Sequence, residues 1–361
     1  MQPFEKAANK TSAIILIKGL KTEYPVPYTV WTRKKGIGKI ATDISLKEAT
    51  NLLQKKNMLA TPICSATSSW QTIVEDQKEL ERIGGVNAYK AYLGVRAVPY
   101  GVFWISVKQQ RSDGCLIIEN LPEKGKTKIL KIEDVIESDL VYPAARGSDI
   151  QRWSATPKIF VLLTQNPKKR EPFPESLMKQ NWPRTYGYLT KFRKAFEVQA
   201  SKAVKALASR TAFYAVLGVG EYTLANYKVL WQGLASDIIA AVVSQAKTPF
   251  GYKKIISTHT TSLFATQNEN EAHYLCAIIN SRPVREFIKS YSSAGRGFGT
   301  PSVMDHVGIP RFDSQNELHQ KLALLSKTLH KFKANDKKEE ITKLEKEVDR
   351  SVNELFGIDN S

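Results

Sequence analysis

The opening part of the chain combines an apolar run, a proline-containing stretch and a capped helix. Residues 12–18 (SAIILIK) form a short apolar run rich in β-branched side chains, which predicts a buried strand. Residues 18–31 contain two prolines that exclude helix and disfavour a sheet interior, so an extended segment is expected. Ser45 stands three positions before Glu48, the spacing of a capping box, and predicts a helix that begins there.

The middle of the chain has the pattern of antiparallel strands interrupted by one helix. Three apolar runs at residues 98–107, 115–121 and 128–132, with the turn sequence PEKGK before the last, predict a meander. From Leu189 to Leu207 apolar side chains step by three and four, with lysines on the opposite side, which predicts one long amphipathic helix. Four further strands are expected at residues 158–164, 227–231, 238–243 and 262–266.

The C-terminal part has a helical pattern only. Apolar side chains step by four and three over residues 318–332 and again over residues 341–355, separated by the polar joint KANDKKEE. The pattern predicts a helical hairpin. Five apolar positions in each arm do not separate a hairpin closed on itself from a coil that binds a partner, and closure on itself is favoured. Strands in the middle and helices at the end define an α+β fold class.

Charge changes this picture more than any single motif does. The 361 residues carry a formal charge of +18, and such an excess favours a polyanionic partner, nucleic acid ahead of a membrane surface. Residues 151–210 hold 13 Lys or Arg against three Glu, whereas residues 313–361 are nearly neutral. Charge concentrated in one segment favours a surface that contacts the phosphate backbone of a nucleic acid. For the lysines of residues 191–205 a solvated helix face remains the alternative.

The cysteines and histidines, which could form disulfides or bind metals, show no spacing typical of either. The three cysteines lie far apart with no CxxC pair, and the five histidines form no HExxH motif. Neither a disulfide framework nor a metal site is expected, and a reducing cytoplasm fits best. The first residues lack an apolar signal core and the apolar runs are too short for a membrane span.

A glycine-rich loop near the end of the chain is a candidate contact with DNA. Residues 294–302 (AGRGFGTPS) combine backbone freedom with Arg296 and with Phe298, an aromatic expected to be exposed. Arg296 could approach a phosphate or read a guanine edge. The alternative is a flexible turn that ends the preceding helix.

Several segments together resemble one known family. The chain is similar to the C-terminal region of adenine-specific N6 DNA methyltransferases of restriction-modification systems, which carries a TaqI-like specificity, or target-recognition, domain. Residues 4–18 look like the last strand of that family's catalytic domain. The other segments that carry the likeness are residues 140–153 (LVYPAARGSDIQRW), 185–196 (TYGYLTKFRKAF), 227–243, 272–288, 295–313 and 345–358.

The resemblance implies a division into three parts. Residues 1–93 would be a remnant of the methyltransferase catalytic sheet with an insertion, residues 94–312 a β-rich DNA target-recognition domain, and residues 313–361 the helical hairpin. The implied function is sequence-specific recognition of double-stranded DNA for an adenine-specific methyltransferase or restriction-modification enzyme.

The family's catalytic segments are absent from this sequence. An Asn-Pro-Pro-aromatic segment would hold the flipped adenine, but the nearest Asn-Pro pair, Asn166-Pro167, is followed by two lysines. The glycine-rich spots at residues 218–220 and 295–299 do not open a helix after a strand, as a cofactor loop would. The catalytic segments are expected before residue 1 or in a partner subunit that binds S-adenosylmethionine. This chain is expected to bind no cofactor.

Two groups of residues are the candidate DNA contacts, and two other functions stay open. Phosphate contacts are assigned to Lys168, Lys169, Arg170, Lys191, Arg193 and Lys194. Base-edge contacts are assigned to Arg96, Tyr100, Arg152 and Arg296, with Arg146 and Phe298 as further DNA-binding candidates. The rival functions are a DNA-acting enzyme, either a nuclease or a methyltransferase with an unrecognised site, and a non-catalytic assembly subunit.

Overall fold

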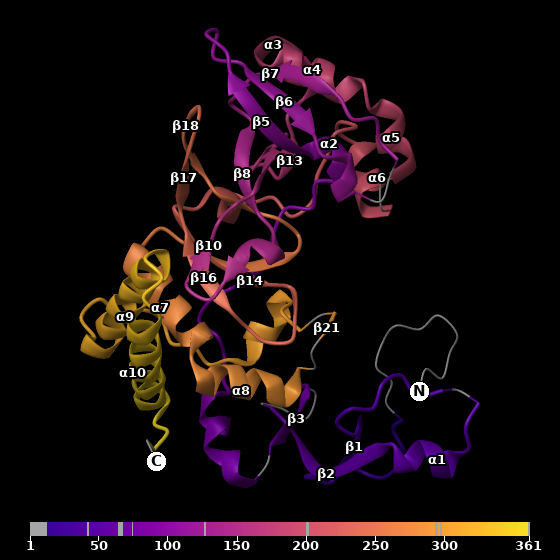
Figure 1. Ribbon diagram of the computed structural model, residues 1–361, viewed down its shortest axis with the longest axis vertical. Helices are drawn as coiled ribbons and strands as arrows, with labels where there is room; N and C mark the ends of the chain where they lie inside the picture. The colour runs from indigo at the N-terminus through magenta and orange to yellow at the C-terminus, as the bar shows by residue number, and fades with distance from the viewer. Residues whose placement is uncertain are drawn as a thin grey trace. The chain divides into compact units, whose positions relative to one another are not determined.

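The chain divides into two compact units, Met1–Glu81 and Arg82–Ser361 (Figure 1). The computed structural model describes residues 13–41, 43–63, 68–73, 75–125, 128–199, 202–292, 295–296 and 298–359. Both units combine helices with antiparallel strands, which confirms the predicted α+β fold. The division into residues 1–93, 94–312 and 313–361 remains a prediction about function.

The first unit is a small antiparallel sheet with a helix between its first two strands. The strand order is β1-β2-β3. The predicted capping box is present: Glu48 N donates to Ser45 Oγ (3.3 Å) and Ser45 N donates to Glu48 Oε2 (2.8 Å). β1 contains a proline and is an edge strand, where a missing N–H is tolerated. The elements are β1 (Val26–Arg33), α1 (Leu46–Asn51), β2 (Leu53–Pro62), β3 (Trp70–Ile73) and the 3-10 helix η1 (Glu75–Ile83).

The strand predicted at residues 12–18 is wrong. Residues 13–17 form neither strand nor helix, and residue 12 lies outside the described residues. The side chains of Ile14, Ile15, Leu16 and Ile17 are exposed, Ile15 to 93%. An apolar sequence forms a strand only where another strand completes its hydrogen bonds, and no described strand pairs with this run. Four consecutive apolar side chains are therefore uncovered.

The second unit begins with a six-stranded sheet of order β19-β8-β11-β5-β6-β7 (Figure 1). The first two strands of the predicted meander are confirmed with shifted bounds, as β5 and β6, and the third, predicted at residues 128–132, is wrong. Residues 100–103 form the short helix α2 (Tyr100–Phe103), and the third strand begins only at Glu133. The strands are β5 (Trp104–Gln110), β6 (Leu116–Asn120), β7 (Glu133–Ile136), β8 (Val141–Ala145), β11 (Ile159–Leu162) and β19 (Ile256–Ser257).

A buried asparagine explains why residues 128–132 are not a strand. Asn120 Nδ2 donates to Leu130 O (3.0 Å), and Ile132 N donates to Asn120 Oδ1 (2.7 Å). The side-chain amide thus occupies backbone groups that a strand ladder would use. The strand register with β6 begins at Glu133, which is opposite Glu119.

Four short helices lie beside this sheet, and the first three of them contribute side chains to its core (Figure 1). They are α3 (Glu175–Asn181), α4 (Pro183–Thr190), α5 (Arg193–Gln199) and α6 (Lys202–Ala208). The single long helix predicted from Leu189 is therefore wrong. Leu189, Phe192 and Phe196 all join the core, as the pattern indicated. The spacing of apolar residues shows which side of a helix faces the core. It does not reveal where one helix ends and the next begins, because helices that pack on the same core keep the same spacing.

A second sheet of order β16-β14-β20-β4 lies against α7. The strands predicted at residues 227–231, 238–243 and 262–266 are confirmed as β14 (Tyr227–Gln232), β16 (Ala240–Val243) and β20 (Thr261–Thr266); β4 is Tyr92–Leu93. α7 (Glu269–Asn280) is almost fully buried and leads into α8 (Arg282–Tyr291). Short elements complete the unit: β9 (Ile150–Gln151), β10 (Ser154–Ala155), β12 (Gln165–Asn166), β13 (Glu171–Pro172), β15 (Leu234–Ala235), β17 (Gln245–Thr248), β18 (Gly251–Lys254), β21 (Gly295–Arg296), η2 (Pro122–Lys124), η3 (Gly147–Asp149), η4 (Glu221–Leu224) and η5 (Pro301–His306).

The predicted C-terminal helical hairpin is confirmed as α9 (Glu317–Ala334) and α10 (Lys338–Phe356). α9 packs against both α10 and α7, so a third helix of the same chain covers the apolar seam. Leu322, Leu329, Val348 and Val352 are buried there. None of the helices in the described part of the chain is long and apolar enough to cross a membrane.

Two histidines are buried where α7, α9 and β16 meet. Val242 N donates to His330 Nε2 (2.9 Å), so His330 Nδ1 carries the proton and donates to Ser326 O (2.7 Å). His273 Nδ1 lies 3.0 Å from Ser326 Oγ, and the two rings meet edge to face. Burial lowers the pKa of both imidazoles, that of His273 to about 3. Both rings are therefore neutral at pH 7.

Acid is expected to destabilise the second unit through these histidines. An unfolded histidine takes up a proton near pH 6.5, whereas folded His273 stays neutral to about pH 3. The unfolded state binds more protons in this window, so the free energy of unfolding falls as pH drops from 6.5 towards 3, by at most about 1.4 kcal/mol per pH unit for each group. Urea denaturation at pH 7, 6, 5 and 4 measures this slope. His273→Asn should flatten it, and an unchanged slope would contradict the assignment.

Candidate nucleic-acid interface

The segment of residues 90–100 is held between two loops of the second unit. On one side Arg96 N donates to Leu217 O (2.8 Å); on the other side His259 N donates to Val95 O (2.9 Å). These bonds bring side chains from three distant parts of the sequence next to one another.

Glycines make this close crossing possible. A Cβ on Gly94 would lie 2.2 Å from Thr258 O, and one on Gly218, whose φ is +72°, would lie 2.7 Å from Gly94 O. Only glycine fits at either position. The glycine-rich spot at residues 218–220 therefore serves backbone packing.

A first aromatic stack lies next to the exposed Arg96. The Tyr100 ring stacks on His259 (centroids 4.6 Å apart, 9° between planes) and on Trp104 (4.7 Å). Tyr100 Oη lies 2.8 Å from His259 Nε2. Burial, helped by the Arg96 charge, lowers the pKa of His259 to about 4, so this ring is neutral at pH 7. Among the described residues, the buried His259 Nδ1 and Trp104 Nε1 have no hydrogen-bond partner.

A second stack is flanked by cations. Tyr92 and Tyr222 lie face to face with centroids 4.1 Å apart and 12° between their planes. Lys90 Nζ is 5.7 Å from the Tyr92 ring centroid, and the positive charge of Arg170 acts on Tyr222. Burial raises the pKa of Tyr222, so it stays protonated. Sequence reasoning missed Lys90, Tyr92, Tyr222 and His259, because no local pattern signals pairing across such separations.

The turn between β12 and β13 presents three exposed cations. Asn166 Oδ1 accepts hydrogen bonds from Lys168 N (2.9 Å) and Lys169 N (3.2 Å), and Arg170 N donates to Asn166 O (2.8 Å). The Asn-Pro pair thus begins a turn stabilised by its own side chain. Lys168, Lys169 and Arg170 are exposed, and none forms an ion pair within the described ranges.

The other predicted phosphate contacts are partly neutralised by their surroundings. Lys191 Nζ lies 2.6 Å from Asp134 Oδ2. The Arg193 guanidinium covers the Phe213 ring at 4.1 Å and lies 3.7 Å from a Glu175 oxygen. Lys194 is exposed with no ion pair in the part of the chain that the structure describes. These three residues lie around the start of α5, beside β7 and α3.

Arg146 is also engaged within the protein. Its guanidinium lies against both carboxylate oxygens of Asp149, at 2.9 and 3.1 Å. The Asp149 side chain is buried and that of Arg146 is mostly buried. The pair therefore stabilises the turn after β8, next to the loop that carries His259.

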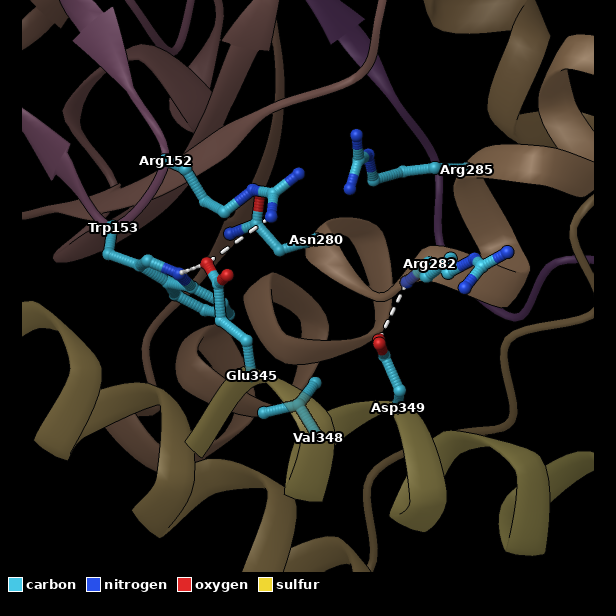
Figure 2. Close-up of a pocket in the computed structure, with 8 residues that line it drawn as sticks. All are labelled: Arg152, Trp153, Asn280, Arg282, Arg285, Glu345, Val348 and Asp349. Carbon is cyan, nitrogen blue, oxygen red and sulfur yellow. Dashed lines mark hydrogen bonds and ion pairs between the residues drawn. The ribbon is translucent and has the colours of Figure 1, made fainter. Parts of the chain in front are cut away.

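Arg152 lines a small polar cavity that faces the C-terminal hairpin. Figure 2 shows Arg152 and Trp153 reaching towards Glu345 of α10. Glu345 Oε1 lies 3.2 Å from Arg152 Nη1 and accepts from Trp153 Nε1 at 2.7 Å. Asp349 Oδ1 accepts from Arg282 N (2.7 Å) at the start of α8. The cavity of about 40 Å³ is far below the roughly 300–1,000 Å³ of small-molecule sites.

The glycine-rich loop is packed more closely than its sequence indicated. The expectation that Phe298 is exposed is wrong, because its side chain is 1% exposed. Next to it, Gly299 O accepts from Trp231 Nε1 (2.9 Å) and from Ser262 Oγ (2.7 Å). The backbone of Arg296 pairs with Leu234, and its side chain lies outside the described residues.

The described residues show no metal-binding group of three or more His, Cys, Asp or Glu side chains. Three of the predicted contact sites, at Arg96, Tyr100 and residues 168–170, adjoin one or the other of the two aromatic stacks. All of them lie along the segment of residues 90–100 or beside the Tyr92–Tyr222 stack. Arg152 and Arg146 have internal partners instead.

No family model matches the chain, and no curated protein matches it. Among solved structures it is similar to the type IIL restriction-modification enzyme MmeI in complex with DNA, with a TM-score of 0.45 and 11% identity, over 77% of this chain and 35% of that chain. It is also similar to the type IIG restriction endonuclease BpuSI, with a TM-score of 0.29 and 13% identity, over 60% of this chain and 26% of that chain. This chain thus spans about a third and about a quarter of these two proteins.

Arg152→Ala is expected to lower stability and to leave DNA affinity unchanged. The substitution leaves Glu345 without its cation, so the free energy of unfolding should fall by about 1–3 kcal/mol. Arg350→Ala, an exposed arginine of the same helix hairpin, is the matched control and should stay within about 0.5 kcal/mol of wild type. Weaker binding to cognate DNA at unchanged stability would instead assign Arg152 to base reading.

Proposed function

We propose that this chain is the DNA target-recognition part of an adenine-specific methyltransferase of a restriction-modification system. The observation that carries the proposal is the exposed turn of Lys168, Lys169 and Arg170 beside the stacked Tyr92 and Tyr222. Three cations without carboxylate partners attract phosphates, and the adjacent planar rings and Arg96 suit contact with a nucleic acid.

Different residues make the phosphate contacts and the base contacts in this proposal. Lys168, Lys169 and Arg170 follow the phosphates, and Lys194 supplements them. Lys191 and Arg193 contribute less, because Asp134 and Glu175 already offset their charge. Arg96 and Tyr100 read base edges, together with Arg296 from the glycine-rich loop. The protein would act in the cytoplasm, where the target DNA is located.

Methyl transfer belongs to another subunit, or to another part of the same protein, that binds S-adenosylmethionine. The exposed run of Ile14 to Ile17 supports this proposal. These residues form no strand in the structure, but consecutive apolar residues are typical of strands in a sheet covered on both faces, as in α/β domains. The run would add to the edge of the partner's catalytic sheet.

Replacing Lys168, Lys169 and Arg170 with Ala together should weaken binding to every DNA sequence about equally. Phosphate contacts position the duplex without reading it, so the ratio of cognate to scrambled affinity should survive. The slope of log affinity against log salt should fall by about 0.9 for each phosphate that the variant no longer neutralises. Fluorescence anisotropy with one cognate and one scrambled duplex at several salt concentrations measures both quantities.

The control for this experiment carries the same change in charge elsewhere. Lys343, Lys346 and Arg350 are exposed cations of α10, in the nearly neutral C-terminal part. Their joint replacement with Ala should leave the salt slope at the wild-type value. Equal slopes for the two triple variants would remove the turn from the DNA interface.

Charged residues in the exposed apolar run should abolish assembly with the catalytic partner. In Ile15→Asp/Leu16→Asp the partner sheet would have to bury two carboxylates, which costs several kcal/mol. Co-purification with a methyltransferase subunit that carries an Asn-Pro-Pro-aromatic segment should fail, and cognate DNA should stay unmethylated. Val86→Asp changes another exposed apolar residue and should retain both assembly and methylation. Methylation by this chain alone would overturn the proposed division of labour.

A further inference from the structure

We propose that the ribbon of residues 28–33 and 53–58 in the first unit is a second contact with duplex DNA, which enters the major groove. The inference rests on the proposed function, because it takes DNA as the ligand. It concerns a part of the chain that contains none of the DNA contacts assigned above.

These residues form a ribbon of two strands. β1 pairs with β2 in eight residue pairs, and the six from Tyr28 with Met58 to Arg33 with Leu53 form the ribbon. β3 pairs with β2 only at residues 59–62. Beyond that point neither outer edge of the ribbon pairs with another strand within the described ranges. The ribbon therefore projects from the three-stranded part of the sheet.

One face of the ribbon carries polar, cationic and aromatic side chains. Residues directly opposite in an antiparallel pair share a face, which places Trp31 beside Lys55 and Thr29 beside Asn57. Trp31 is 49% exposed, and Lys55 Nζ lies 5.9 Å from its ring centroid. Thr29 Oγ1 donates to Asn57 Oδ1 (3.2 Å). Arg33 lies on the same face, at the end of the strand.

The charge around the ribbon lacks internal compensation. Residues 13–63 contain nine Lys or Arg and three acidic residues. One of those three, Glu48, is engaged in the capping box with Ser45. No ion pair forms among the described residues of this range. Lys55 and Lys56 lie on the ribbon itself, and Lys34, Lys35 and Lys39 lie in the loop that follows β1.

This chemistry selects a polyanion over a protein surface. A protein partner would have to bury several unpaired lysines, each at a cost of several kcal/mol. Phosphates pair with lysines and release counterions on binding. The apolar run of residues 14–17 shows the opposite character, since it has no charge and suits a protein interior. The first unit thus presents two surfaces with different partners.

The dimensions of the ribbon fit duplex DNA. Two paired strands lie about 4.8 Å apart and six residue pairs extend about 20 Å. The major groove, about 12 Å wide, admits a two-stranded ribbon. In that position the face of Thr29, Trp31 and Asn57 meets base edges. Lys55 on this face and the lysines of the loop then approach the phosphates on either side, while Lys56 lies on the opposite face of the ribbon.

The test is DNA binding by the full chain carrying Lys55→Gln/Lys56→Gln. The salt slope of binding to duplex DNA should fall by about 0.9 for each phosphate that these lysines neutralise in the wild-type complex. Lys343→Gln/Lys346→Gln makes the same change in charge on α10 and should keep the wild-type slope. Both lysines of the ribbon are exposed, so circular dichroism should report an unchanged fold. As a second measurement, a photo-crosslinking phenylalanine in place of Trp31 should attach to labelled duplex.

The outcomes separate this inference from the proposed function. If the ribbon variant binds like wild type while the residue 168–170 variant is weakened, the ribbon is not a DNA contact and the proposed function stands. If residue 31 crosslinks to RNA, to anionic vesicles or to the methyltransferase subunit rather than to duplex DNA, the inference is also overturned. If the wild-type chain with its partner binds no duplex at all, the proposed function itself fails.

Discussion

The close crossing of three backbones at Gly94, Gly218 and Thr258 is the constraint on which the second unit depends. Near Gly94 the chain passes from the smaller sheet to the six-stranded sheet, and near Thr258 it passes back, so the crossing sets the positions of the side chains that follow. Arg96 and Tyr100 come shortly after Gly94, and His259 comes directly after Thr258. A side chain at either glycine would overlap a carbonyl oxygen and force these backbones apart. The two aromatic stacks exist because the backbones can approach this closely.

The distribution of partners among the arginines and lysines matters more than their number. Several cations in the basic stretch of residues 151–210 have carboxylates within reach, whereas the turn of residues 168–170 has none in the described part of the chain. Cations already paired within a protein gain little from a phosphate, since one attraction replaces another. The number of cations in this stretch of the sequence is therefore larger than the number available to bind DNA phosphates. The turn and Lys194 are described parts of this stretch in which the positive charge is still available.

Local signals in the sequence predict local structure well and long-range contacts poorly. The capping box at Ser45 and the C-terminal hairpin follow from spacing alone, because hydrogen bonds and periodicity within a few residues determine them. The strands predicted at residues 158–164, 227–231, 238–243 and 262–266 are correct because each also finds a pairing strand in the fold. The run at residues 12–18 fails as a strand because its pairing partner is not among the described strands. Phe298 is buried because Trp231 and Ser262, remote in sequence, hold the loop at Gly299. The pairing of Tyr92 with Tyr222 leaves no trace in either segment, so no sequence pattern could have shown it.

The uncovered run of residues 14–17 has a consequence for how the protein must be produced. Four adjacent apolar side chains in water form a surface to which the exposed apolar residues of incompletely folded chains also bind. Such surfaces lead to aggregation and to capture by chaperones and proteases. A copy whose run stays uncovered is therefore short-lived. The amount of chain that persists in a cell would then follow the supply of whatever covers the run, and matched rates of synthesis would set its abundance.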